Sequence, residues 1–313
     1  MERPLDAVAP LWFRSAIVNV TMPTVLITGT SSGIGLATAL ELGRAGYKVY
    51  ATMRNPARAP QLGEQAGKEG LPVSIFTMDV DSDQSVAACF AAIYGQNENI
   101  DILVNNAGIE RHGSVEELPL ADVRAIMETN YFGALRCIQQ VTPRMRERKS
   151  GCIINVTSVA GKIACSPITA YSASKYALEA LSEGLAGEMK PFGVRVAIVQ
   201  PGIIDTPMPH AIKTAPASKY PNGRNFGALF SAALQQPVPP SIVGVAIRNI
   251  IESGTWKLRH PVGPDAEPFL GWRAGMTDEQ WVDFNALDAD GFRQRVKTDF
   301  GLDLDLPAAA AAS

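Results

Sequence analysis

Two side chains that could pass a proton to a substrate stand four residues apart in the stretch Tyr171-Ser-Ala-Ser-Lys175. On a helix this spacing places them on one face, one turn apart. A neighbouring ammonium favours the phenolate of a tyrosine, whose pKa is ordinarily about 10. The pair therefore predicts a proton donor or acceptor near neutral pH. Because the same spacing also occurs on solvated helices without function, other motifs must support this interpretation.

A glycine-rich turn lies between an apolar run, residues 24–28, and a helical pattern over residues 34–45. Glycines let backbone N–H groups approach a pyrophosphate, and the helix N-terminus adds the positive end of its dipole. The glycine spacing departs from G-x-G-x-x-G, so a purely structural turn is an alternative. We expect a dinucleotide to contact the turn residues Gly29, Ser31, Ser32, Gly33, Ile34 and Gly35.

The end of the second predicted strand, residues 48–52, indicates which dinucleotide binds. An acidic residue there grips the ribose hydroxyls of NAD, whereas a basic residue meets the 2′-phosphate of NADP. The chain continues with Met53-Arg54 and has no acid at this point. The planar guanidinium of Arg54 suits a phosphate, so NADP(H) is preferred and NAD(H) is the second choice. A solvated surface arginine is the alternative interpretation.

Predicted strands and helices alternate along most of the chain. Further strands are predicted at residues 73–78, 100–104, 152–156 and 195–199, and helices from Asp81 toward Tyr94, over 120–145, around Tyr171 and over 241–253. Asp81 and Gln84 have the spacing of a capping box. Such alternation requires parallel strands joined by right-handed crossovers, which predicts an α/β fold with a doubly wound sheet.

The C-terminal part has a looser pattern. Residues 206–240 are rich in Pro, Ala and Gly and predict a long irregular segment, either a linker or, preferably, a substrate lid. An edge strand is predicted at 256–259, within a C-terminal extension over 255–306 whose Trp272, Trp281 and Phe284 should pack onto the body. We interpret residues 1–22 as an N-terminal extension and residues 307–313 as a disordered tail.

Composition narrows the class of partner. The chain has 313 residues, 46% of them hydrophobic, and a formal net charge of −3, so no global basic field is available to attract nucleic acid. It contains no run of 18 apolar residues that would span a membrane. Its four cysteines and three histidines lack metal-ligand spacing, and free thiols are typical of the reducing cytoplasm. We expect a cytoplasmic protein with a small-molecule partner and no metal.

Together these motifs resemble the short-chain dehydrogenase/reductase family. The glycine turn, Asn105-Asn106-Ala107-Gly108, the Tyr171 and Lys175 pair, and Pro201-Gly202 follow the family's order and spacing over about residues 24–206. The resemblance implies a single Rossmann-like domain, residues 23–306, with a mostly parallel seven-stranded sheet and helices on both faces. It implies further cofactor contacts from Asp79, Val80, Asn105, Asn106, Ala107, Gly108, Tyr171, Lys175, Pro201, Gly202, Ile204 and Thr206. Asp79 could instead cap the next helix.

The resemblance also implies an NAD(P)-dependent oxidoreductase with four catalytic residues. Hydride transfer to a carbonyl leaves charge on its oxygen, so Tyr171 and Ser158 should converge there, with Tyr171 giving its proton. Lys175 would lower the pKa of the phenol and bind the nicotinamide ribose. Asn130 would hold a water that passes protons to Lys175. Either Asn130 or Ser158 alone could merely satisfy local hydrogen bonds.

The substrate is less closely indicated. Residues 48–54 and 258–263 resemble the hydroxysteroid and retinol dehydrogenase-like branch, which implies a steroid-, retinoid- or lipid-like substrate. An apolar pocket is compatible with five aliphatic residues that could equally be core, and the stretch Glu110-Arg111-His112 would place polar groups beside it. These aliphatic residues are Ile109, Ile163, Ile168, Ile203 and Met208.

Two other functions stay open. A 3-oxoacyl-carrier-protein reductase should receive its carrier on a basic patch, for which Arg144, Arg146, Arg148 and Lys149 are candidates, although a solvated helix end explains them as well. A cofactor-binding regulator would keep the fold without turnover. The family also implies a homodimer or homotetramer, formed through the helices that carry Asn130 and Tyr171.

Overall fold

The computed structural model describes residues 22–306 except 97, 213–217 and 221, so the predicted tail and all but Met22 of the N-terminal extension lie outside it. At its centre is a seven-stranded sheet of order β3-β2-β1-β4-β5-β6-β7 with every neighbouring pair parallel. The predicted Rossmann-like, doubly wound sheet is confirmed. Its strands are β1 (Thr24–Thr28), β2 (Lys48–Met53), β3 (Val73–Thr77), β4 (Ile102–Asn105), β5 (Gly151–Val156), β6 (Val194–Pro201) and β7 (Arg259–Val262).

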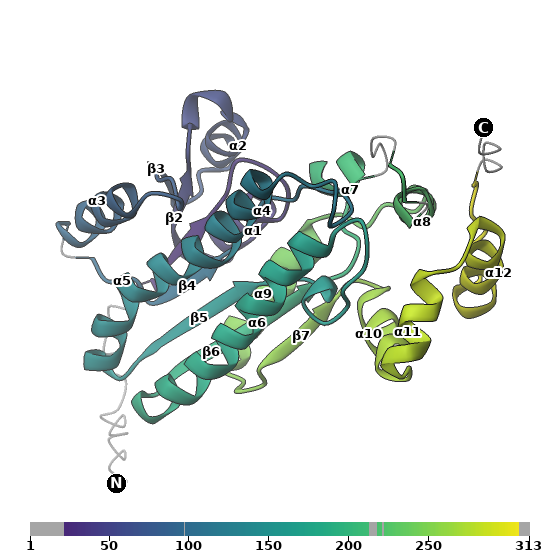
Figure 1. Cartoon of the computed structure of the whole chain (residues 1–313). Coiled ribbons are helices and arrows are strands. Elements are labelled where there is room, and N and C mark those ends of the chain that lie inside the picture. Colours follow the sequence, from purple (N-terminus) through teal and green to yellow (C-terminus); the bar gives the residue numbers. More distant parts are fainter. Residues whose placement is uncertain (1–21, 97, 213–217, 221, 307–313) are drawn as a thin grey trace, which may run out of the picture.

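Helices cover both faces of the sheet (Figure 1). Because successive side chains of a strand point to opposite faces, Val25 and Ile27 enter one core while Leu26 enters the other. The first core lies beneath α1 (Gly33–Arg44), α2 (Gln61–Glu69) and α9 (Ser241–Ser253). The second lies beneath α3 (Asp83–Tyr94), α5 (Gly133–Arg148) and α6 (Thr169–Met189). Burial on both faces explains why these strands are continuous apolar runs.

The long helix predicted over 120–145 has three parts. These are α4 (Leu120–Met127), a π-helical turn (Glu128–Phe132) and α5. Short 3₁₀ turns occur at Pro56–Arg58, Val159–Gly161 and Lys190–Phe192.

The capping box predicted at the start of α3 is wrong. Ser82 is the N-cap, and its hydroxyl accepts the backbone N–H of Ser85 at 3.2 Å. The Asp81 carboxylate instead accepts the hydroxyl of Thr129 at 3.0 Å, a partner from the π-helical turn. Asp81 is therefore engaged in a tertiary contact and does not cap α3, although its spacing from Gln84 predicted a cap.

Two C-terminal predictions also need correction. The described part of the segment 206–240 is largely helical, since it contains α7 (Pro207–Ile212) and α8 (Asn222–Ala233). The last strand lies at Arg259–Val262 and not at 256–259. Pro261 can belong to this strand because β7 is the edge of the sheet, where a missing N–H costs no ladder hydrogen bond.

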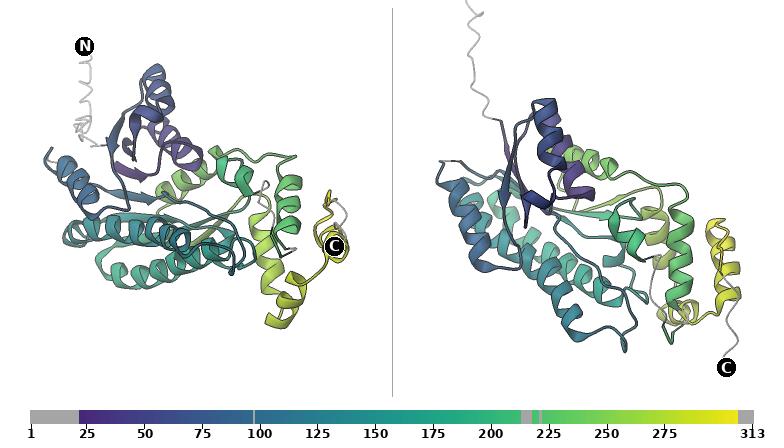
Figure 2. Two further views of the ribbon diagram at one scale, coloured as in Figure 1. Left: turned by 45° about the horizontal axis from the view of Figure 1, so that its top comes forward. Right: turned by 90° about the horizontal axis from the view of Figure 1, so that it is seen from above.

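Three helices follow β7 in the described part of the chain: α10 (Ala266–Ala274), α11 (Asp278–Asn285) and α12 (Ala289–Phe300). They lie beside α8 at one end of the sheet (Figure 2). The rings of Trp272, Trp281 and Phe284 contact one another at centroid distances of 4.8–5.6 Å. Of the three, Trp281 also packs against the cluster that contains Ala160 and Cys165, as expected of a residue that packs onto the body. Trp281 Nε1 also donates to the carbonyl of Ala164 at 2.9 Å. This bond ties the C-terminal helices to the loop before α6.

Candidate active site

A cavity of about 420 Å³ opens at the carboxyl ends of the strands, the usual place for a ligand in an open parallel sheet. It brings together every predicted site residue of the cofactor and catalytic groups except Asn130 and Asn105. The members on its wall are Gly29, Ser31, Ser32, Gly33, Ile34, Gly35, Arg54, Asp79, Val80, Asn106, Ala107, Gly108, Ser158, Tyr171, Lys175, Pro201, Gly202, Ile204 and Thr206.

The glycine turn is locked to the loop after β4. Thr28 Oγ1 accepts the backbone N–H groups of Asn106 and Ala107 at 3.0 and 2.9 Å, and Asn106 Nδ2 donates to the carbonyl of Gly29 at 3.0 Å. Gly29 has a φ of +71°, and a Cβ there would lie 2.7 Å from Ala107 Cα. Ser32, the N-cap of α1, makes no side-chain capping bond. The first turn of α1 thus keeps backbone N–H groups that can donate hydrogen bonds to a phosphate.

The cavity wall carries an exposed cation after β2 and an acid after β3. Arg54 lies at the cavity wall just after β2, as expected of a group that meets a 2′-phosphate. Asp79 does not cap α3; its Oδ1 accepts the backbone N–H of Asp81 at 3.2 Å. Its position at the carboxyl end of β3 leaves it on the wall beside Val80.

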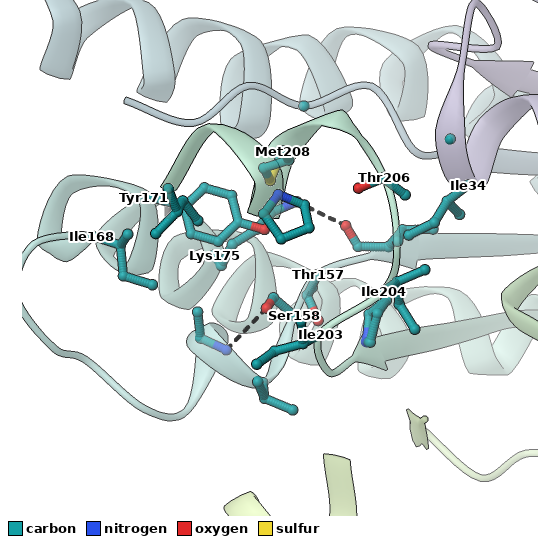
Figure 3. Close-up of a pocket in the computed structure, with 18 of the residues that line it drawn as sticks. Ile34, Thr157, Ser158, Ile168, Tyr171, Lys175, Ile203, Ile204, Thr206 and Met208 are labelled. Carbon is teal, nitrogen blue, oxygen red and sulfur yellow. Dashed lines mark hydrogen bonds between the residues drawn. The ribbon is translucent and has the colours of Figure 1, made fainter. Parts of the chain in front are cut away.

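The three proton-bearing groups lie together, Ser158 just after β5 and Tyr171 and Lys175 on α6 (Figure 3). Tyr171 and Lys175 are buried, and Lys175 Nζ lies 5.6 Å from the Tyr171 ring centroid. Lys175 Nζ donates to the carbonyl of Val156 at 2.9 Å, which fixes the ammonium behind the ring. Ser158 Oγ accepts the backbone N–H of Ala160 at 3.1 Å, so its own proton can be donated to the Tyr171 oxygen or to a substrate oxygen.

Burial is the main cause of the pKa shifts of Tyr171 and Lys175. It raises the pKa of Tyr171, and the hydrogen bond with Ser158 acts in the opposite direction. Burial also lowers the pKa of Lys175 to about 8, while the charge of Glu179 opposes that shift. The expected lowering of the Tyr171 pKa by Lys175 is therefore not the main effect. Burial raises this pKa, and the side chain that lowers it is Ser158.

Asn130 lies in the π-helical turn, away from the cavity wall. Its Nδ2 donates to the carbonyl of Ile109 and to Ser174 Oγ, both at 2.9 Å, and its Oδ1 accepts the Ile109 N–H at 2.8 Å. One donated bond and the accepted bond thus hold the loop at Ile109, and the other donated bond ties Asn130 to α6. The structure shows Asn130 as a brace for this loop, and its role toward a water stays a prediction.

A buried carboxylate, Glu179, was missed by the sequence reasoning. Its Oε1 accepts Thr157 Oγ1 at 2.8 Å and Gln200 Nε2 at 3.1 Å, and its Oε2 accepts Arg259 Nε at 2.9 Å. It therefore joins the ends of β5, β6 and β7 one helical turn beyond Lys175. Its position four residues after Lys175 could have indicated a counter-charge on the same helix face. Its partner Arg259, however, is 80 residues away and could not be predicted from the spacing.

The remaining wall is mostly apolar and includes aromatic as well as aliphatic side chains. All five predicted aliphatic residues line it. Glu110 and His112 do not; Glu110 is buried, with Oε2 3.3 Å from His112 Nδ1, and its charge raises the pKa of Tyr171. The sequence reasoning missed the aromatic part of the wall, to which α8 and the C-terminal helices contribute Phe226, Phe230, Phe269, Trp272, Trp281, Phe284, Phe292 and Phe300.

The wall fits a nicotinamide dinucleotide. The locked glycine turn and open helix end suit a pyrophosphate, Arg54 suits a phosphate on the adenosine side, and the cavity runs on from there to Lys175 and Pro201-Gly202. In the described part of the chain no group of three or more His, Cys, Asp and Glu side chains is arranged to hold a metal. Within residues 22–306, leaving aside the gaps, no helix has the length and hydropathy to cross a bilayer.

Known proteins share this sequence and fold. A family model described as short chain dehydrogenase matches residues 23–217. Retinol dehydrogenase 8 of Homo sapiens is 40% identical over 187 residues, which cover 58% of this chain and only 59% of the relative. A short-chain dehydrogenase from Streptomyces avermitilis has a similar structure, with a TM-score of 0.72, 30% identity and coverage of 84% and 97% of the two chains. A single-substitution variant of actinorhodin polyketide ketoreductase with NADPH gives a TM-score of 0.69 and 27% identity over 78% and 97%.

Proposed function

Because the chain belongs to the short-chain dehydrogenase family of NAD(P)-dependent oxidoreductases, we propose that it interconverts a ketone or aldehyde and an alcohol by hydride transfer with NADP(H). One observation carries the proposal. A single cavity joins the glycine turn and Arg54 to Ser158, Tyr171 and Lys175, and then continues along an apolar wall. A cofactor, three proton-bearing side chains and an apolar substrate can therefore meet in one place.

The nicotinamide supplies or accepts the hydride when the cofactor is bound. Tyr171 gives its phenolic proton to the carbonyl oxygen during reduction and takes a proton from the alcohol during oxidation. Ser158 donates a second hydrogen bond to the same oxygen. Lys175 donates one N–H to the carbonyl of Val156, and its two other N–H groups are available to the ribose hydroxyls. The ammonium also places a positive charge near Tyr171. Asn130 supports this group by holding the loop at Ile109.

Two features support NADP(H) over NAD(H). Strand β2 ends in Met53, without the acid that would grip an unmodified ribose, and Arg54 at the wall can pair with a 2′-phosphate. A structural neighbour of the same family carries NADPH. The preference for NADP(H) is part of the proposal.

We propose a steroid-, retinoid- or lipid-like substrate. The wall beyond Tyr171 is aliphatic and then aromatic, which suits a long apolar molecule with a single reacting carbonyl or hydroxyl. A relative that the chain matches over 59% of its length is named a retinol dehydrogenase. In this proposal residues 206–240, with α7 and α8, act as a lid, and the C-terminal extension over 255–306 closes the far end of one domain spanning 23–306.

The carrier-protein alternative has less support. Arg144 lies over the Tyr94 ring at 3.9 Å, and Arg148 donates to the carbonyl of Ile100 at 3.0 Å. Both cations are thus already engaged within the chain and are poorer docking groups for an acidic carrier. The regulator alternative conflicts with the presence of Asn130, Ser158, Tyr171 and Lys175 together.

We also propose a homodimer or homotetramer in the cytoplasm. Phe132 and Tyr176 are exposed by 43% and 41% on the helical layer that contains α5 and α6. A second copy that covers these rings would remove apolar surface from water.

The function is tested by following NADPH absorbance with a panel of ketosteroids, retinals, oxoacyl thioesters and simple aromatic ketones. We expect turnover of one of the large apolar carbonyl compounds. Turnover confined to the thioesters would favour the carrier-protein alternative. NADP(H) binding without turnover of any carbonyl or alcohol would favour the regulator.

A further inference from the structure

Asp265 lies between β7 and α10, in the stretch Gly263-Pro264-Asp265. It is the N-cap residue of α10, yet its side chain makes no capping bond to that helix. Aspartate at an N-cap ordinarily accepts an N–H of the first helical turn. The Asp265 carboxylate is directed elsewhere, so its position needs another explanation.

The carboxylate reaches the turn that follows β6. Asp265 Oδ2 accepts the backbone N–H of Ile203 at 2.7 Å, across 62 residues of sequence. Its Oδ1 is buried without a hydrogen-bond partner among the described groups. A Cβ on Gly202 would lie 2.1 Å from that Oδ1, so the carboxylate is pressed against the backbone of the turn.

The contacted turn is part of the cavity, whereas Asp265 is behind it. Pro201, Gly202 and Ile203 line the wall, and Asp265 does not reach it. Ile203 lies beside Ser158 (Figure 3). A second bond, from the Gly202 N–H to the carbonyl of Val262 at 2.9 Å, holds the same turn against β7. The turn is therefore fixed from its outer side by the segment that begins the C-terminal helices.

We propose that Asp265 is a positioning residue that holds the 201–203 turn against the nicotinamide half of the cofactor and couples that turn to α10. The inference rests on the proposed function, because it assumes a nicotinamide dinucleotide in the cavity. It assigns Asp265 no contact with the cofactor. Its effect should be confined to the nicotinamide half, since Arg54 follows β2, which three strands separate from β6 in the sheet.

The test measures binding of two ligands by calorimetry. NADP⁺ is compared with 2′-phospho-ADP-ribose, which lacks only the nicotinamide. In Asp265→Ala we expect about tenfold weaker binding of NADP⁺, because a charged hydrogen bond to the turn is lost, and unchanged binding of 2′-phospho-ADP-ribose. Asp265→Asn keeps an acceptor for Ile203 and should recover most of the NADP⁺ affinity.

Asp278→Ala is the matched control. Asp278 belongs to the same C-terminal helices but is exposed and pairs with Arg273 at 2.8 Å instead of with the turn. It should leave both affinities unchanged. If Asp265→Ala does not fold, Asp265→Ser, whose hydroxyl can cap α10, takes its place in the comparison.

Equal weakening of both ligands in the Asp265 variant, or no weakening of NADP⁺, would overturn the inference. Failure of the unaltered protein to bind either ligand would overturn the proposed function itself, and the inference with it. The two failures are thus told apart by the unaltered protein.

Discussion

The cofactor side of the cavity is held by backbone groups and short polar side chains, whereas the substrate side is held by aromatic rings of separate helices. On the cofactor side, Thr28 and Asn106 tie two neighbouring strand ends together through main-chain atoms. On the substrate side, Trp281 donates to the carbonyl of Ala164. Where the two sides meet, Asp265 accepts the N–H of Ile203. The geometry of the cofactor side depends on the positions of glycines and hydroxyl groups. The geometry of the substrate side depends on how separate helices pack.

This difference has a functional consequence. A phosphate site made of main-chain N–H groups recognises what every nicotinamide dinucleotide shares, while a wall of side chains from α8 and α10–α12 can change with the substrate. The two sides should therefore be separable by mutation. The proton-bearing group of Ser158, Tyr171 and Lys175 stands between them and should affect turnover with any substrate.

The largest effect is expected at the centre. Tyr171→Phe removes the proton donor and should lower kcat/KM about a thousandfold with every substrate, while NADP(H) binding is retained. The measurement is steady-state kinetics together with calorimetric titration of NADP⁺. Tyr176→Phe is the control, because Tyr176 is on the same helix but exposed. If Tyr171→Phe retained more than a tenth of the activity, Tyr171 would not be the general acid.

The next effect tests the cofactor side alone. Met53→Asp combined with Arg54→Ala supplies an acid for the ribose and removes the phosphate partner, and should shift the ratio of kcat/KM for NADPH over NADH about a hundredfold toward NADH. The KM of the carbonyl substrate should not change. Arg58→Ala, an exposed arginine of the neighbouring 3₁₀ turn, should leave the ratio as it is. A changed substrate KM in the double variant would break the separation of the two sides.

A smaller effect is expected at Glu179, which links the two sides. Glu179→Gln keeps the shape of the side chain but removes the charge that raises the pKa of Lys175. That pKa should fall below its value of about 8, so the loss of activity on raising the pH through the Lys175 pKa should begin at lower pH. We expect kcat at neutral pH to fall by about tenfold, as for a lost charged hydrogen bond.

Glu183→Gln is the control for this pH profile. Glu183 also pairs with Arg259, at 2.9 Å, but is exposed. If Glu179→Gln lowered kcat without moving the pH profile, Glu179 would be a structural brace and not the counter-charge of Lys175. An equal shift in Glu183→Gln would point to Arg259 instead.

The sequence predicts the cofactor side well because its determinants are local. The glycine turn follows β1 directly, and Tyr171 and Lys175 share one helix, so spacing alone places them. Parallel topology then brings strand ends to one edge, which is why nearly all predicted site residues lie on one wall.

The substrate side could not be predicted in the same detail. The Asp265 bond to Ile203 and the Trp281 bond to Ala164 join segments that no motif connects. The contact between Thr28 and Asn106 also spans 78 residues, but it follows from the parallel pairing of β1 with β4. Composition also misled, because the Pro, Ala and Gly content of 206–240 suggested irregular chain where α7 and α8 form. Helices that bury one face against a neighbour override weak local propensity.

The smallest effect tests the substrate side alone. Trp281→Phe keeps an apolar aromatic ring at the wall but removes the indole N–H that binds Ala164 and leaves extra space at the far end. A long apolar substrate such as a retinal should lose about threefold in kcat/KM, since its far end gains room and loses contacts. A short aromatic ketone, which ends before this region, should be unaffected, and so should the affinity for NADP⁺. Trp256→Phe, at an exposed tryptophan near Lys190, serves as the control. An equal loss with both substrates would mean that Trp281 supports the catalytic centre through α6, and the two sides of the cavity would then be one mechanical unit.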